Sequence, residues 1–178
     1  MKKQIAYIAR LAVTLLVITA AVAAALAGVN AITAPRIAAT REEKTQQAIE
    51  AVLPGGGTEI EGFSDASGLV KAVYASDTGY AVLVAPGGFD GAIDMMVGVS
   101  PEGKVLGISI ISHTETAGLG AVAAAKTAAG EAFRDQFSQA DAPFTVGENV
   151  DAITSATITS KAVTAGVNAA VELVKTLG

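Results

Sequence analysis

Three hydroxyl side chains, those of Thr154, Ser155 and Thr157, lie close together near the C-terminus. The sequence predicts that a helix begins here, and the first N–H groups of a helix have no partner within it. Hydroxyl oxygens and unpaired N–H groups would then converge on a site that favours negative charge, such as a phosphate. The simpler interpretation is that these residues only cap the helix, as Ser and Thr often do.

The helix that would carry this site is indicated by apolar residues at Val163, Val167, Ala170 and Val174. Their spacings of four, three and four residues place them on one face of a helix. Such a face can pack on a core, so it would hold the hydroxyl site in place.

The run from Asp151 through Thr154, Ser155 and Ala156 to Thr157 resembles a known motif. It is similar to the flavinylation motif of the FMN-binding domain in the G subunit of Rnf/Rsx electron-transport complexes and in the C subunit of the Na+-translocating NADH:quinone reductase. In that family the last threonine of the motif carries FMN through a phosphoester bond, which implies Thr157 as the acceptor. Ser155 stands where the family usually has glycine, and a positive φ there would suit serine less well.

A second segment, residues 113–120, is similar to the family's His-x-Glu-Thr-Pro-Gly-Leu-Gly segment, with Ala117 in place of the proline. The resemblance implies that this segment lies against the flavin. From the residues alone, His113 could instead cap a turn and Glu115 could be a solvated loop charge. The cofactor-binding residues that the resemblance implies are Thr157, Asp151, Thr154, Ser155, Ala156, His113, Glu115, Thr116, Gly118 and Leu119.

The N-terminal part has no charged residue between positions 11 and 35. About 20 apolar residues suffice to cross a membrane, so this segment is a candidate transmembrane helix. Lys2, Lys3 and Arg10 precede it, and the positive-inside bias then places the N-terminus in the cytoplasm and the rest of the chain outside. A cleaved signal peptide is the alternative, because positions 20–27 are rich in small residues that a signal peptidase could accept.

Composition narrows the possible chemistry. All 17 acidic residues but only nine of the 12 basic ones follow the apolar segment, which disfavours a nucleic-acid partner. Cysteine is absent, so the chain has no disulfide, iron–sulfur ligand or c-type haem attachment, and redox chemistry would need an organic cofactor. A single histidine, His113, gives little support to a metal site, and no Gly-x-Ser-x-Gly elbow indicates a hydrolase.

The order of the elements predicts an α+β fold: a transmembrane helix and one external FMN-binding domain with an antiparallel sheet and flanking helices. The predicted boundaries are a cytoplasmic stub at 1–10, a transmembrane helix at 11–35, a stalk helix and Pro/Gly break at 36–57, and the domain at 58–178. The predicted strands are 58–63, 69–75, 80–85, 91–99 and 105–111, and the helices before the motif helix are 119–129 and 131–137.

The resemblance implies a membrane-anchored flavoprotein subunit of an Rnf-type ion-translocating ferredoxin:NAD+ oxidoreductase complex. Its FMN, covalently held on Thr157, would relay electrons between other membrane and peripheral subunits, at the outer side of the cytoplasmic membrane. A Mg2+-dependent flavin transferase would attach the FMN. No substrate site of its own and no catalytic residue are expected, since no dinucleotide-binding Gly-x-Gly-x-x-Gly follows a strand. The alternative is a non-redox pilin-like or adhesion domain on a membrane helix.

Overall fold

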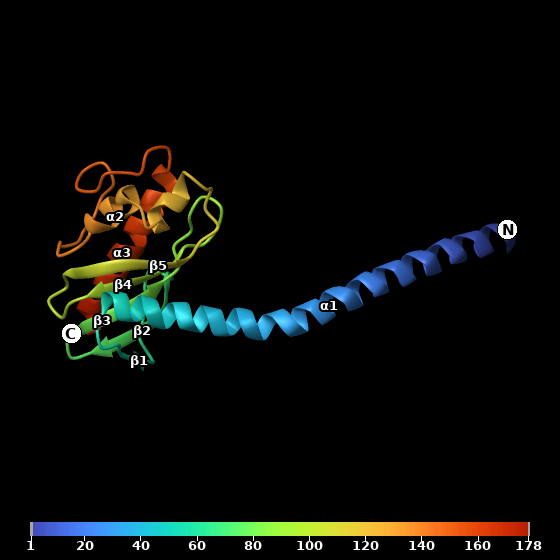
Figure 1. The fold of residues 1–178 in the computed structure, drawn as a ribbon, viewed down its shortest axis with the longest axis horizontal. Coiled ribbons are helices and arrows are strands. Elements are labelled where there is room, and N and C mark those ends of the chain that lie inside the picture. The colour runs from blue at the N-terminus through green and yellow to red at the C-terminus, as the bar shows by residue number, and fades with distance from the viewer. Residues whose placement is uncertain (1, 178) are drawn as a thin grey trace. The chain divides into compact units, whose positions relative to one another are not determined.

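The computed structural model describes the backbone of residues 2–177. The described chain begins with a long helix, α1 (Lys2–Val52), and ends with another, α3 (Thr157–Leu177). Between them lie a five-stranded sheet, a short 3₁₀ helix, η1 (Gly120–Ala124), and α2 (Ala128–Asp135) (Figure 1). The chain divides into two compact units, one ending at residue 43 and the other beginning at residue 44.

The first unit is the part of α1 up to residue 43, which includes its long apolar stretch. Its large apolar side chains, among them Leu15, Val22 and Ile32, are more than half exposed. A helix that is apolar all round normally lies in a protein core or in a membrane. Because no protein covers these side chains, α1 is the candidate membrane span of the described residues, and it is long enough to cross the hydrocarbon core.

The second unit is built on an antiparallel sheet whose strands follow one another in chain order. The strands are β1 (Thr58–Ile60), β2 (Val70–Ser76), β3 (Gly79–Val84), β4 (Asp94–Val99) and β5 (Val105–Ser112). The predicted antiparallel sheet is therefore confirmed, with β1 shorter than expected. Gly62 follows β1 with φ +80°, a backbone conformation outside the strand region, so the extended run cannot continue to residue 63.

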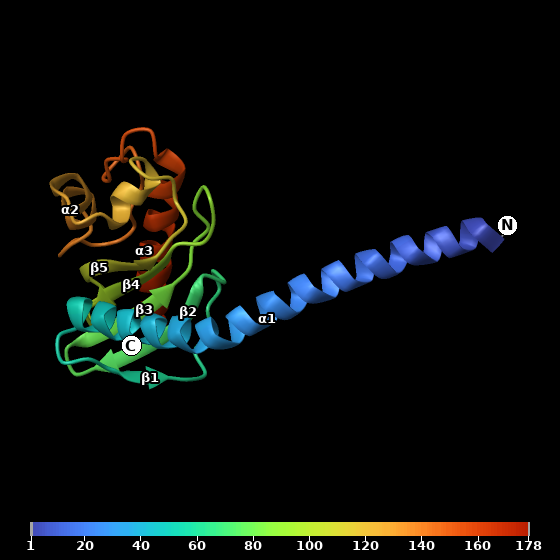
Figure 2. The same ribbon diagram turned by 45° about the vertical axis from the view of Figure 1, so that its right-hand side comes forward.

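Helices pack on both faces of the sheet (Figures 1 and 2). Because neighbouring strand residues point to opposite faces, Met95 packs in the cluster that includes α3, whereas Met96 packs against Ile49 and Val52 at the end of α1. All four apolar residues of the predicted α3 face are buried, which confirms that face. Burying a side chain of valine size contributes about 1.5–3 kcal/mol, so α3 is firmly fixed.

The region between β5 and α3 corrects one expectation. The sequence predicts an α-helix over 119–129, but the chain instead forms η1 and then becomes extended at Ala125 and Thr127 before α2. Thr127 caps α2 through its side chain. Arg134 of α2 donates a hydrogen bond to the carbonyl oxygen of Ala125 at 3.0 Å, and this contact stabilises the non-helical segment between η1 and α2.

Candidate functional site

The hydroxyl residues of the C-terminal motif lie at the beginning of α3. The first intrahelical bond of α3 runs from the Ser160 N–H to the Ala156 carbonyl oxygen, at 2.9 Å. The N–H groups of Thr157, Ile158 and Thr159 therefore have no hydrogen-bond partner within the helix. A helix of 21 residues also places a partial positive charge at this end, so the first turn favours an anionic group such as a phosphate.

Polar side chains hold the loop that leads into α3. Ser160 accepts a hydrogen bond from the Ile153 N–H at 3.0 Å and donates one to the Ala156 carbonyl oxygen at 2.9 Å. Further back, the amide side chain of Gln136 accepts from the Asp151 N–H at 2.7 Å and donates to the Asp151 carbonyl oxygen at 3.2 Å. The loop is thus anchored at both ends without any contribution from its exposed hydroxyl groups.

Ser155 has an unusual backbone conformation. Its φ is +60°, in the left-handed region that favours glycine. For a residue with a Cβ this conformation costs about 1–2 kcal/mol. The structure therefore gives a physical reason why the resembling motifs have glycine at this position, and it shows that this chain tolerates serine at a cost in strain.

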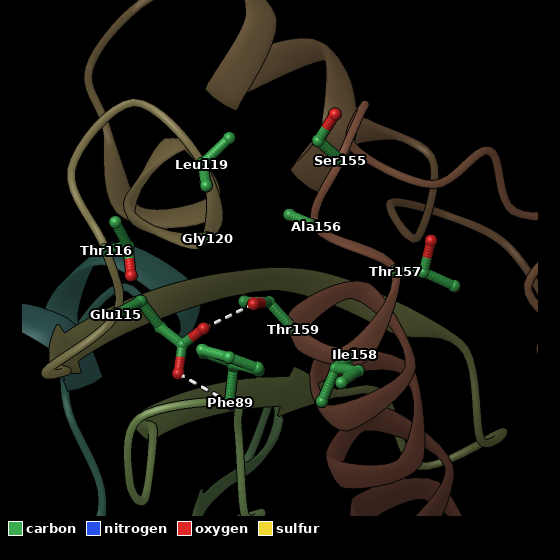
Figure 3. A pocket seen from close by; sticks show the side chains of 10 residues that line it. All are labelled: Phe89, Glu115, Thr116, Leu119, Gly120, Ser155, Ala156, Thr157, Ile158 and Thr159. Atoms are coloured by element: carbon green, nitrogen blue, oxygen red, sulfur yellow. Dashed lines mark hydrogen bonds between the residues drawn. The ribbon is translucent and has the colours of Figure 1, made fainter.

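A pocket of about 320 Å³ lies beside the first turn of α3 (Figure 3). Both segments singled out in the sequence line it, and in Figure 3 Leu119 lies across the pocket from Ser155 and Ala156. The structure thus brings together six of the predicted site residues. The lining consists of Phe89, Glu115, Thr116, Leu119, Gly120, Ser155, Ala156, Thr157, Ile158 and Thr159.

The pocket has an apolar rim. Phe89 is 69% exposed, Ile158 53% and Leu119 41%. In the described part of the chain, these are the large apolar side chains outside α1 that are exposed. An apolar rim next to a phosphate-binding helix end suits a ligand with a flat apolar ring and a phosphate, so the residues present fit FMN.

Glu115 lies at the inner side of this pocket and is only 7% exposed. Its Oε1 accepts hydrogen bonds from the N–H groups of Phe89 at 2.9 Å and Asp90 at 3.1 Å, and its Oε2 accepts one from the Thr159 hydroxyl. Burial by itself raises the pKa of this carboxyl group, but the three hydrogen bonds and the nearby His113 together lower it by more, so the net pKa lies below the ordinary value for glutamate. Glu115 is consequently ionised at neutral pH.

Other predicted site residues lie elsewhere. Gly118, Asp151 and Thr154 line a second pocket, of about 530 Å³, together with residues of α2. His113 lines neither of these two pockets, and its Nδ1 is buried without a hydrogen-bond partner. Nine of the ten predicted residues are therefore distributed over two pockets, and His113 lines neither of them.

Four residues that line the first pocket are absent from the predicted set: Phe89, Gly120, Ile158 and Thr159. Ile158 and Thr159 directly follow the motif and lie in the first turn of α3, so placing the helix start at Thr157 would have predicted them as site residues. Phe89 stands in a Gly-Gly-Phe-Asp-Gly turn, where an exposed aromatic residue is itself a signal of binding.

Comparison with known proteins gives matches along most of the chain. Residues 88–172, which include every residue of the first pocket, match the FMN-binding domain family. The G subunit of the proton-translocating ferredoxin:NAD(+) oxidoreductase complex of Clostridium ljungdahlii is 40% identical over 163 residues, covering 85% of this chain and 83% of the relative. The G subunit of the Na(+)-translocating complex of Acetobacterium woodii is 32% identical, covering 94% and 92%. The G subunit of an ion-translocating oxidoreductase complex of Methanosarcina acetivorans is 32% identical, covering 94% of each chain.

Proposed function

The chain belongs to the family of G subunits of ion-translocating oxidoreductase complexes, and from this premise we propose that it holds FMN and relays electrons within such a complex. The observation that carries the proposal is the pocket at the start of α3, where an apolar rim meets the free N–H groups of a helix. Bound FMN supplies the redox chemistry, whereas the chain supplies binding, orientation and electrostatics. The partners in this proposal are the other membrane and peripheral subunits. The non-redox pilin-like alternative finds no support among the relatives.

Thr157 is the proposed covalent acceptor of FMN. It is exposed, it lines the pocket, and it is the first residue of α3. Its neighbours are less suitable: Thr154 lines the other pocket, and the Thr159 hydroxyl is buried and donates to Glu115. A phosphate esterified to the Thr157 hydroxyl would lie close to the N–H groups of the first turn. In this proposal a flavin transferase moves FMN from FAD to the Thr157 hydroxyl: the new phosphoester bond replaces the pyrophosphate bond of FAD, and AMP leaves with the hydroxyl proton. Phe89, Leu119 and Ile158 would then hold the ring.

The change of Thr157 to alanine tests this attachment most simply. Thr157→Ala removes the acceptor oxygen but leaves the buried face of α3 intact, so the protein is expected to fold and to lose all covalent flavin. Intact-mass analysis and in-gel flavin fluorescence after denaturation measure the loss. Thr154→Ala is the matched control, because Thr154 is an exposed hydroxyl residue of the same loop, and it should retain one FMN per chain. One FMN remaining on Thr157→Ala would contradict the assignment.

The proposed orientation places the N-terminus in the cytoplasm and the FMN pocket on the outer side of the cytoplasmic membrane. It follows from Lys2, Lys3 and Arg10, which precede the uncharged part of α1. The chain has no cysteine, so Glu61→Cys, at an exposed position after β1, provides a single label. We predict that this cysteine reacts with a membrane-impermeant thiol reagent on intact spheroplasts. Labelling only after lysis would reverse the orientation.

A further inference from the structure

The carboxylate of Glu115 joins three segments that are distant in sequence. Its partners Phe89 and Asp90 lie 26 and 25 residues before it, and Thr159 lies 44 residues after it. The first two belong to the loop between β3 and β4, and the third belongs to the first turn of α3. These two segments and the one that carries Glu115 are the walls of the pocket (Figure 3).

The tip of the β3–β4 loop is held by Glu115 and by its neighbour Thr114. The Gly88 N–H bonds the Gly91 carbonyl oxygen at 2.7 Å, which leaves Phe89 and Asp90 at the tip of the loop. The Oε1 atom of Glu115 accepts both tip N–H groups. The neighbouring Thr114 hydroxyl donates to the Asp90 carbonyl oxygen at 2.8 Å. The backbone of the tip is therefore held from the segment after β5, while the Phe89 side chain remains exposed.

Two glycines make room for this carboxylate. A Cβ built on Gly88 would collide with Glu115 and lie 2.9 Å from Ile93. A Cβ built on Gly120 would collide with Glu115 and lie 2.5 Å from the Thr159 hydroxyl. The backbone thus approaches the carboxylate closely on two sides, which only glycine permits.

We propose that Glu115 is a positioning residue: it fixes Phe89 and the first turn of α3 relative to each other, and it does not contact the flavin itself. Both of its oxygens are already engaged by groups of the protein, and charge-assisted hydrogen bonds of this kind are among the strong ones. The apolar wall at Phe89 and the acceptor Thr157 then form one preorganised pocket. The inference rests on the proposed function only for the identity of the ligand.

The test compares Glu115→Gln, Thr159→Val and Thr159→Ser in the full-length chain in detergent, produced without the flavin transferase. Hydrogen exchange read by mass spectrometry reports on peptides that cover residues 86–93 and 157–166, because Ser160 is the first residue of α3 whose N–H group is hydrogen-bonded within the helix. We expect exchange about tenfold faster in residues 86–93 for Glu115→Gln, because the hydrogen bonds there lose their ionised acceptor. Thr159→Val should speed exchange at the start of α3, and Thr159→Ser, which keeps the hydroxyl, should restore it. Glu148→Gln, at an exposed turn carboxylate, is the matched control and should change neither peptide.

A second measurement uses the same variants loaded with FMN. Looser positioning should reduce the visible circular dichroism of the flavin in Glu115→Gln and Thr159→Val and leave it intact in Thr159→Ser. If Glu115 contacts the flavin directly, Glu115→Gln would leave exchange in the unloaded chain unchanged and would alter only the flavin spectrum; that result overturns the proposal. A wild-type chain that takes up no FMN would refute the proposed function, whereas the exchange data would still decide the role of Glu115.

Discussion

The two segments that resemble the family's motifs are built in opposite ways. In the segment from Asp151 to Thr157, the hydroxyl residues Thr154, Ser155 and Thr157 are exposed, and Ser160 and Gln136 hold the backbone. In the segment from 113 to 120, the charged side chain of Glu115 turns inward and binds other parts of the protein. The two segments therefore contribute differently to the pocket: one presents exposed hydroxyl groups, and the other, through Glu115 and its partners Phe89, Asp90 and Thr159, forms a hydrogen-bonded frame.

The largest expected effect on stability comes from adding a side-chain atom beside the Glu115 carboxylate. Gly120→Ala places a Cβ against the Glu115 carboxylate and the Thr159 hydroxyl, so we predict a loss of about 1–3 kcal/mol in the free energy of unfolding. Chemical denaturation of the full-length chain measures this loss. Gly107→Ala is the control, because nothing lies within 4 Å of its added Cβ. Equal stabilities of the two variants would show that the frame is not tightly packed.

For the segment from Asp151 to Thr157 we predict a smaller change in the free energy of unfolding, of the opposite sign. Ser155→Gly removes the strain of a positive φ and should stabilise the protein by up to about 1 kcal/mol, without changing the amount of covalent FMN. Ser155→Ala keeps the Cβ and therefore the strain, so it should give no such gain. A gain from alanine as large as that from glycine would mean that the serine hydroxyl, and not the backbone, carries the cost.

The sequence is sufficient to predict the elements with strong local signals. The sheet, the apolar face of α3 and the family resemblance are confirmed by the structure and by the relatives. The break between η1 and α2 is not predicted, because Thr127 reads as part of an alanine-rich helix, although it caps α2. A tertiary contact also ends the helix there, because Arg134 donates a hydrogen bond to the carbonyl oxygen of Ala125.

The site is predicted only in part, and for a similar reason. Local spacing places the hydroxyl residues at the start of a helix, and the family resemblance then singles out Thr157 among them as the expected acceptor. The inward direction of Glu115 could not be predicted, because its partners Phe89, Asp90 and Thr159 come from segments 25 to 44 residues away. The assignment of Gly118, Asp151 and Thr154 to a second pocket also depends on how α2 packs beside the loop.

We propose that the flavin of this protein relays electrons and that the protein has no substrate of its own. Rapid-mixing spectroscopy tests it directly, by following flavin absorbance in the isolated protein and in the assembled complex. We predict that NADH does not reduce the isolated protein at a useful rate, whereas the bound flavin is reduced when the complex receives its electron donor. Fast oxidation of NADH by the isolated protein would contradict the role of electron relay and identify the protein as an enzyme in its own right.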